Sequence, residues 1–231
     1  MPTISIVMPT YNNLDYLPAA IDCILKQSCN DYEFIIVNDG STDGTKKYLD
    51  EFKEKNKGKP NVDKIKIFHK ENGGTGSALN LGFSKAIGIW YTWVSSDNVY
   101  DENYLYELAQ CFHKNPTIDF VYSDFRFIDE NDKFMFDIIR PPYIKGCLIG
   151  GCCVGICFMY KKELADNAGP YDEVLNTQDY DMWLRMEELG DFLHIAKNLG
   201  SYREHSKTVT NSKPSDHLIC IERAKKRRKI S

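Results

Sequence analysis

The stretch FIIVNDGSTDG, residues 34–44, decides the fold of this chain. Its apolar first four residues predict a buried strand, and the small and polar residues that follow predict a turn and the start of a helix. Asp39 therefore stands just past the carboxyl end of a strand, where open α/β sheets bind ligands. Its carboxylate suits a hydrogen bond from a base or a ribose, and a helix N-cap in an ordinary turn is the alternative.

Strands and helices alternate on both sides of this stretch. Apolar runs and helical spacing predict strands at residues 4–8, 65–68 and 89–94, and helices at residues 13–27, 42–56, 77–86 and 101–114. Strand–helix units that follow one another in this way predict an α/β fold, with a Rossmann-like, mostly parallel sheet and helices on both faces.

The second half of the chain has a different pattern. It predicts a strand at 120–128, a hairpin turn at 129–133, an irregular stretch at 137–146, helices at 161–167 and 178–189, and short strands at 192–196 and 199–203. No repeat or linker interrupts the pattern, so we expect one domain that continues into a smaller mixed region and ends near residue 212.

Charge and hydropathy limit the classes of partner. A net charge of −4 over 231 residues gives no global reason to expect nucleic acid. Residues 223–229 form a basic run that could meet anionic lipid headgroups or nucleic acid, and a solvated helix end or a truncation point is the alternative. No apolar segment is long enough to span a bilayer, and the first residues lack a secretion signal, so we expect a cytoplasmic protein.

Four of the eight cysteines cluster at Cys147, Cys152, Cys153 and Cys157. Their spacing lacks the paired Cys-x-x-Cys of zinc sites, and the segment around them is apolar. We therefore expect buried free thiols at these positions, because cysteine behaves as a small hydrophobic residue in such surroundings. Without a secretion signal we expect no disulfides.

Short polar motifs follow the predicted strands. PTYN at 9–12 and SSDN at 95–98 come at strand ends, as Asp39 does, so all three should meet at one edge of the sheet. Tyr11 could stack on a planar base there. The glycine loop at 73–76 is neither a Walker A motif nor a dinucleotide fingerprint, because it lacks the required lysine and glycine spacing.

Taken together, SIVMPTYN (5–12), IIVNDGSTDGT (35–45), NGGTGSALNLG (72–82) and DYDMWLR (179–185) resemble the family 2 glycosyltransferases. These are inverting enzymes with the GT-A fold. The resemblance runs in order from residue 3 to about residue 210. It implies a nucleotide-binding half at 1–115, an acceptor-binding half at 116–212 and a basic tail at 213–231.

The resemblance also implies a donor site. In the family, the residue matching Asp39 binds the base, usually uracil, and the position of Tyr11 packs on the same base. Asp97 matches the aspartate that holds Mn²⁺ or Mg²⁺ against the diphosphate, which suits a hard cation, and His205 would be a further ligand. A structural histidine is the alternative at His205. The donor contacts implied are Pro9, Thr10, Tyr11, Asp39, Asn80, Ser95, Ser96 and Asp97.

This chain departs from the family pattern near the metal. Ser95 and Asn98 stand where carboxylates are common, which should weaken metal binding, although Ser95 could still bond a ribose hydroxyl. Leu79 stands where the family often has arginine before the asparagine matching Asn80. Lys70 could replace that charge or could be a solvated residue at a strand end.

The same resemblance makes Asp179 the general base, because inversion requires one carboxylate on the acceptor side. Asp181 is the fallback base, and an N-cap role for Asp179 is the structural alternative. Gln178 replaces the usual glutamate, so we expect the pKa of Asp179 to lie near that of an ordinary aspartate. The apolar loop at 146–159 and Trp183 would shape the acceptor pocket.

The resemblance therefore implies transfer of a sugar from a nucleotide-sugar donor, with UDP favoured, to a hydroxyl of a carbohydrate or lipid-linked glycan in glycan or polysaccharide biosynthesis. The basic tail could add a peripheral membrane contact. A binding module without catalysis is one alternative, which Ser95, Asn98 and Gln178 favour. A nucleotidyltransferase is another, which PTYNN at 9–13 disfavours, because that class has a glycine- and arginine-rich loop after its first strand.

Overall fold

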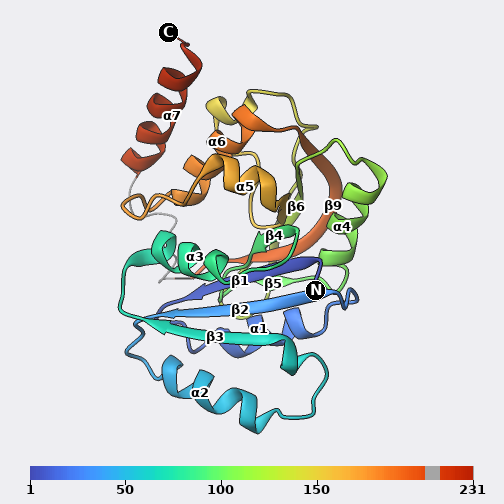
Figure 1. The fold of residues 1–231 in the computed structure, drawn as a ribbon, viewed down its shortest axis with the longest axis vertical. Helices are drawn as coiled ribbons and strands as arrows, with labels where there is room; N and C mark the ends of the chain where they lie inside the picture. Colours follow the sequence, from blue (N-terminus) through green and yellow to red (C-terminus); the bar gives the residue numbers. More distant parts are fainter. Residues whose placement is uncertain (206–213, 231) are drawn as a thin grey trace.

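The computed structural model describes residues 1–205 and 214–230. Its core is one sheet in the order β3-β2-β1-β4-β8-β6-β9-β5, with β7 paired to β6 (Figure 1). The strands of the first half are parallel and comprise β1 (Ile4–Thr10), β2 (Tyr32–Asp39), β3 (Ile65–Lys70) and β4 (Trp90–Trp93). Residues 34–37 of β2 are fully buried, and each such side chain contributes about 1.5–3 kcal/mol of burial.

The second half adds strands of both directions. Antiparallel β8 (Phe158–Lys161) links β4 to β6 (Phe120–Ile128), and β6 runs parallel to β9 (Phe192–Arg203). Short β5 (Val99–Tyr100) pairs with β9, and β7 (Phe134–Ile138) pairs with β6. The prediction of two short strands at 192–196 and 199–203 was wrong, because β9 continues through register shifts against β6.

Helices cover both faces of the sheet, which confirms the predicted layers. One face carries α1 (Leu17–Leu25), α2 (Thr45–Lys55) and α4 (Tyr104–Lys114), and the other carries α3 (Gly74–Ser84), α5 (Lys162–Ala168) and α6 (Gln178–Leu189). Strand β1 shows why: Ile6 and Met8 pack in the first core, and Val7 packs in the second. Short 3₁₀ turns lie at Val62–Lys64 and Cys147–Gly150.

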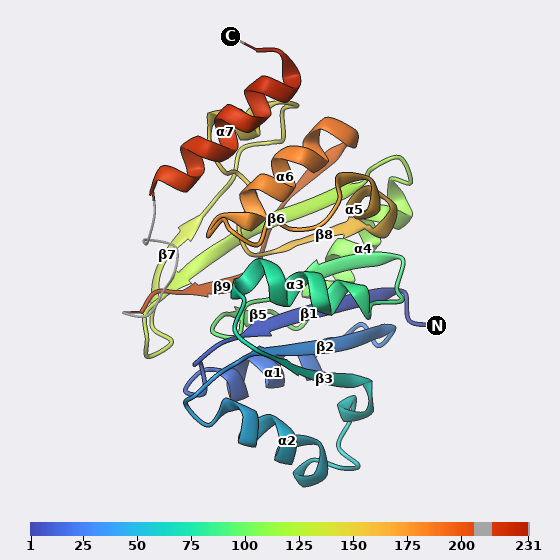
Figure 2. The ribbon, with the colours of Figure 1, turned by 60° about the vertical axis from the view of Figure 1, so that its left-hand side comes forward.

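The basic end of the chain forms helix α7 (Pro214–Arg228), which lies beside α6 (Figures 1 and 2). Cys220 and Ala224 are buried in the second core. Arg223 pairs with Asp172 at 2.8 Å, and Arg227 and Arg228 pair with the two glutamates that end α6. Much of the basic run is therefore neutralised by the domain, while the expected boundary at residue 212 lies outside the described residues. No helix in the described ranges is long and apolar enough to cross a bilayer.

Candidate functional site

The first strand end carries Thr10 and Tyr11 to the edge of the sheet. Thr10 is buried, and its hydroxyl has no hydrogen-bond partner among the described residues, whereas the Tyr11 ring is 50% exposed. The Asn13 amide donates to Ser96 Oγ at 2.9 Å, which joins this loop to the end of β4. The strand ends therefore meet as predicted, on the side where α3 and α6 begin (Figure 2).

Asn12 links the same loop to the end of β2. Its backbone is left-handed, with φ 50°, and its side-chain oxygen accepts from the Thr42 N–H at 2.7 Å. The Asn12 N–H donates to Ser41 Oγ at 3.0 Å. These bonds hold Tyr11 beside the loop that follows Asp39. The sequence motif contained Asn12, but no role was predicted for it.

The Asp39 carboxylate holds the glycine loop. Oδ1 accepts from Lys70 Nζ at 2.8 Å and from the Gly73 N–H at 3.0 Å, and Oδ2 accepts from the Gly74 N–H at 2.8 Å. A carboxylate offers about four acceptor positions, and these three donors among the described residues occupy three of them. Lys70 is thus an ion-paired residue rather than a solvated one.

An open hollow of about 640 Å³ lies at the ends of β2 and β3, next to Asp39. Gly40 allows this shape, because it has φ +74° and a Cβ there would come within 2.6 Å of the Asn72 backbone N. The hollow is lined by Asn38, Gly40, Ser41, Lys46, His69, Lys70, Glu71 and Asn72. Ser41 of this lining accepts from the N–H of Asn12, the residue that follows the exposed Tyr11. The hollow therefore offers hydrogen-bonding groups, close in the chain to an exposed aromatic ring, for a planar heterocycle.

Asp97 and His205 come together from the ends of β4 and β9. Asp97 Oδ2 lies 3.2 Å from His205 Nε2, and the His205 side chain is only 4% exposed. The His205 ring also packs on Tyr16, with centroids 4.7 Å apart. In the described part of the chain, no three His, Cys, Asp or Glu side chains form a metal cluster. The structure thus brings together the two side chains that the sequence predicts as metal ligands.

Arg203 holds this pair in place, a role that sequence reasoning missed. Its buried guanidinium donates to the Asp97 carbonyl at 2.8 Å and to Asp132 at 2.7 Å, and it lies 4.9 Å from the Tyr16 ring centroid. Asn98 accepts the Arg203 N–H at 3.0 Å. Asn98, at a position where a carboxylate is common, thus uses its amide oxygen to bind the backbone of β9. In the sequence, the only indication of a role for Arg203 is its position two residues before His205.

Ser95 lies at the same strand end. Its N–H donates to the Tyr100 hydroxyl at 3.1 Å, which fixes the backbone of the turn before Asp97. Ser95 is partly buried. The structure therefore fixes the backbone of Ser95, while a ligand contact of its hydroxyl stays a prediction.

Asn80 is held by hydrogen bonds within the protein, and its neighbour Leu79 lies in the core. The Asn80 amide accepts the Tyr171 N–H at 2.8 Å and donates to the Tyr171 carbonyl at 3.0 Å and to Glu173 at 2.9 Å. Leu79 is fully buried in the core. Asn80 thus ties α3 to the segment that leads into α6, where Gly76 also packs against the Asp172 carbonyl.

Asp179 lies in the first turn of α6, at the end of that segment. The helix N-cap is Thr177, so the N-cap alternative for Asp179 is wrong. The Tyr180 N–H donates to Asp179 Oδ1 at 2.7 Å. Burial raises the pKa of Asp179 above its ordinary value, and the Tyr180 N–H and His217 of α7 oppose that rise. The expectation of an ordinary pKa was therefore wrong, because desolvation matters more here than the neighbour at Gln178.

The other candidates around Asp179 are engaged in the fold. Asp181 is buried and pairs with Arg185 at 2.9 Å. Gln178 is buried against the Leu175 and Asn176 carbonyls, and Trp183 packs edge-on against the Phe158 ring at 5.3 Å. Trp183 is therefore a core residue behind the expected acceptor pocket.

The cysteine cluster lies in the loop beside Asp179. Cys157 is buried, as expected, whereas Cys147, Cys152 and Cys153 are only partly buried. The thiols of Cys147 and Cys153 lie 3.2 Å apart, within hydrogen-bond distance, and form no disulfide. Burial raises the pKa of the Cys147 thiol to about 12, which makes it a poor nucleophile.

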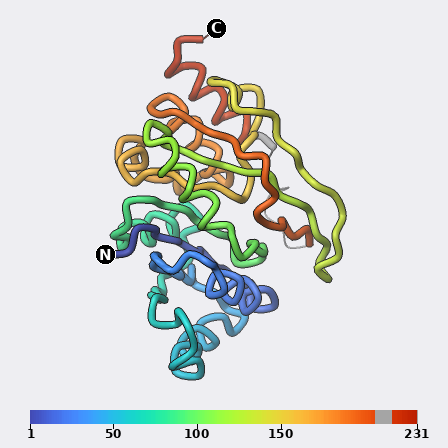
Figure 3. Tube along the Cα trace, turned by 90° about the vertical axis from the view of Figure 1, so that its right-hand side faces the viewer, coloured from blue at the N-terminus to red at the C-terminus, as the bar shows by residue number. Residues whose placement is uncertain are grey.

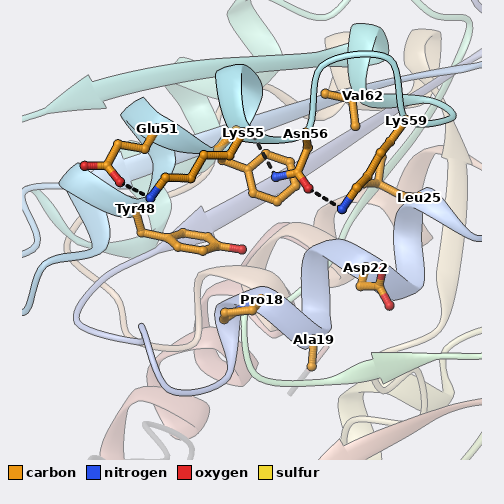
Figure 4. Close-up of a pocket in the computed structure, with 11 residues that line it drawn as sticks. Pro18, Ala19, Asp22, Leu25, Tyr48, Glu51, Lys55, Asn56, Lys59 and Val62 are labelled. Atoms are coloured by element: carbon orange, nitrogen blue, oxygen red, sulfur yellow. Dashed lines mark hydrogen bonds and ion pairs between the residues drawn. The ribbon is translucent and has the colours of Figure 1, made fainter.

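A second groove, of about 470 Å³, lies between α1 and α2 (Figure 4). It lies on the face of α1 and α2, away from the residues described above. Its polar residues already bond one another: Lys55 pairs with Glu51, and Lys59 donates to Asn56 at 2.8 Å. We assign it no function.

Comparisons with known proteins identify a family and several relatives for this chain. Glycosyl transferase family 2 matches residues 5–169 of the chain. An uncharacterized glycosyltransferase of Rickettsia bellii is 36% identical over 201 residues, covering 80% of this chain and 27% of that protein. The chondroitin synthase of Pasteurella multocida is 26% identical over 239 residues, covering 100% of this chain and 24% of that protein. The chain thus spans about a quarter of the length of these relatives.

Solved structures show the same fold. TarS of S. aureus in complex with UDP-GlcNAc has a TM-score of 0.78 at 19% identity, covering 97% of this chain and 65% of that one. The mannosyltransferase PcManGT of Pyrobaculum calidifontis, in complex with GDP-Man and Mn²⁺, has a TM-score of 0.70 at 17% identity, covering 90% and 59%.

Proposed function

The chain belongs to glycosyl transferase family 2 and has the GT-A fold, and from that premise we propose that it is an inverting enzyme that transfers a sugar from a UDP-sugar to a glycan hydroxyl. The observation that carries the proposal is that three strand ends, which carry Tyr11, Asp39 and Asp97, lie together on the side of the sheet where α6, which carries Asp179, begins (Figure 2). Residues 1–115 would bind the donor, and the following residues would bind the acceptor.

For the donor, we propose that Tyr11 stacks on the base and that the remaining acceptor position of Asp39 binds a base N–H. Pro9 and Thr10 would shape the strand end, where the buried Thr10 hydroxyl lacks a partner. Ser95 and Ser96 would face the ribose and the diphosphate. Complexes of structural neighbours with UDP-GlcNAc and with GDP-Man support a nucleotide-sugar donor, and uracil is the base we propose.

For the metal, the Asp97 carboxylate and the His205 imidazole form a donor set that fits Mn²⁺ better than Mg²⁺. Two protein ligands leave the other positions to phosphate oxygens and water. When bound, the ion would offset the negative charge that develops on the leaving diphosphate. Arg203 and Tyr16 would keep the two ligands in place.

Removing divalent metal should therefore weaken UDP binding. We expect excess EDTA to lower UDP affinity by at least about tenfold, because a contact between charged groups contributes about 1.5–3 kcal/mol. Calorimetric titration of UDP with Mn²⁺ and with EDTA measures this. Equal affinities in the two titrations would rule out the metal role of Asp97 and His205.

For the chemistry, we propose that Asp179 removes the proton from the attacking acceptor hydroxyl. Asp181 is less suited, because its carboxylate is bound to Arg185. Burial of Asp179 favours its role, since a raised pKa makes a carboxylate a stronger base near neutral pH.

The pH profile of transfer should show this raised pKa. A base acts only when deprotonated, so kcat/KM should fall as the pH drops through the pKa of Asp179. The half-maximal point should lie above the value of about 3.9 for an ordinary aspartate. Measuring kcat/KM between pH 4 and pH 8, over roughly the range where carboxylates and histidines titrate, tests it. An acid limb at or below the ordinary value would contradict the proposed role of desolvation.

A further inference from the structure

Arg140 stands apart from the other arginines. The chain has seven arginines, all within the described residues, and six of them pair with a carboxylate: Arg126, Arg185, Arg203, Arg223, Arg227 and Arg228. Arg140 pairs with none of the described carboxylates, and its Nε is buried without a hydrogen-bond partner. A partly buried guanidinium without an acceptor is costly, because its donors lose water and gain nothing in return.

The position of Arg140 is well defined. Its backbone N–H donates to Asp124 Oδ1 at 2.7 Å, and the same oxygen lies 2.8 Å from His194 Nε2. The Arg140 guanidinium carbon lies 5.5 Å from the Phe125 ring centroid, which places it over that ring. Asp124 is thus occupied by other donors, and the guanidinium is held in place without an anion.

This guanidinium lies near the proposed base. The Phe125 ring packs against Gly155, where a Cβ would come within 2.3 Å of it, so Arg140 lies over a ring that touches the loop beside Asp179. The pKa of Cys152, in that loop, depends on the charges of both Asp179 and Arg140. Burial and the Asp179 carboxylate together raise the pKa of its thiol to about 12, and the Arg140 guanidinium opposes the rise.

Resting on the proposed function, we infer that Arg140 binds an anionic group, a carboxylate or a phosphate, that the acceptor carries next to its reacting hydroxyl. Arginine suits this role, because its planar fork binds either group through two parallel hydrogen bonds. The donor diphosphate belongs with Asp97 and His205 at the strand ends, so the Arg140 guanidinium is left for the acceptor. The acceptor class is therefore an acidic saccharide rather than a neutral one.

The test measures binding of glucose, glucuronic acid and glucose 6-phosphate by ligand-observed NMR, with UDP and Mn²⁺ present. We expect the wild type to bind at least one acidic probe about tenfold more tightly than glucose, since one charge-assisted contact contributes that much. The two acidic probes separate carboxylate from phosphate recognition. Arg140→Gln should remove the preference, and Arg140→Lys should keep part of it.

Lys145→Gln is the matched control. Lys145 lies in the same segment and carries the same charge, but it is exposed and pairs only loosely with Asp191 at 3.4 Å. It should keep the full preference for acidic probes, and thermal unfolding would show that each variant is folded. UDP affinity should be unchanged in Arg140→Gln.

Three results would overturn the inference: equal binding of all three sugars by the wild type, an unchanged preference in folded Arg140→Gln, or a loss of UDP affinity in that variant, which would make Arg140 a donor ligand. The proposed function is tested by a separate measurement, the release of UDP from a UDP-sugar. If the protein releases UDP but does not bind acidic sugars more tightly than glucose, only the proposed role of Arg140 is wrong.

Discussion

Asp179→Asn should lower the rate of sugar transfer by roughly 100- to 10,000-fold, the range that a positioned general base supplies. The amide has nearly the same shape, but it cannot accept the proton of the acceptor hydroxyl. UDP affinity should remain that of the wild type, because the donor residues lie on the strand ends. Transfer is measured as nucleotide released in the presence of acceptor, and UDP affinity by calorimetry.

Folding can be separated from catalysis in this variant. A raised pKa means that the folded state favours the neutral carboxyl, so the ionised group opposes folding at pH values above its unfolded pKa. The neutral amide removes that opposition, and Asp179→Asn should be at least as stable as the wild type at neutral pH. Asp191→Asn, an exposed charge loss beyond the end of α6, should transfer sugar normally. Full activity in Asp179→Asn would remove Asp179 from the base role.

Glu187→Ala should lower the free energy of unfolding by about 3–5 kcal/mol, as expected when one partner of a buried ion pair is removed. The Glu187 side chain is fully buried, and its Oε2 accepts from Arg228 at 2.7 Å. Its Oε1 accepts from the Gly146 N–H at 3.0 Å and the Tyr143 hydroxyl at 3.2 Å. The substitution removes the acceptor of the Gly146 N–H and the Tyr143 hydroxyl, and it leaves Arg228 with the Leu184 carbonyl at 3.1 Å and Glu188 at 3.4 Å. Urea unfolding of the full chain measures the loss.

Glu188→Ala is the matched control on the same helix. Glu188 pairs with Arg227 at 3.0 Å and more loosely with Arg228 at 3.4 Å, but it is more exposed than Glu187, so its loss should cost only about 0–1 kcal/mol. Equal losses in the two variants would show that Glu187 does not join α7 and the Tyr143–Gly146 segment to α6 more strongly than Glu188 does.

Local patterns were sufficient to predict the parallel half and the start of α6. The run at 34–37 is apolar on every residue because both faces of a parallel strand are buried, and that property is visible in sequence. The helix at Gln178–Leu189 has the predicted bounds. These features depend on neighbouring residues, so they can be derived without knowledge of the distant partners.

Elements that depend on long-range pairing could not be derived in the same way. Strand β7 has Phe134, Met135 and Phe136 all exposed, so no alternation marks it, and it exists through pairing with β6. Strand β9 is held through its register shifts by parallel pairing with β6. The charges of α7 suggested a solvated end or a lipid contact because their partners, Asp172 and the glutamates of α6, are distant in sequence.

The candidate site shows the same division. Spacing placed Asp39, Asp97 and Asp179 at element ends, but it could not show that Asp39 also holds the glycine loop. It could not show that Asn80 is bound to the Tyr171 backbone, or that burial would raise the pKa of Asp179. Such details depend on desolvation and on partners up to 91 residues away, as for Asn80 and Tyr171.

The central claim is that this chain turns over a nucleotide sugar rather than only binding it. The most direct measurement is nucleotide released from UDP-GlcNAc, UDP-glucose, UDP-glucuronic acid and GDP-mannose, with Mn²⁺ and with glucose, glucuronic acid and glucose 6-phosphate as acceptors. We predict release from at least one UDP-sugar by the wild type and none above background by Asp179→Asn. Tight UDP binding by the wild type without release from any of these donors would contradict the claim and favour a nucleotide-sugar-binding module.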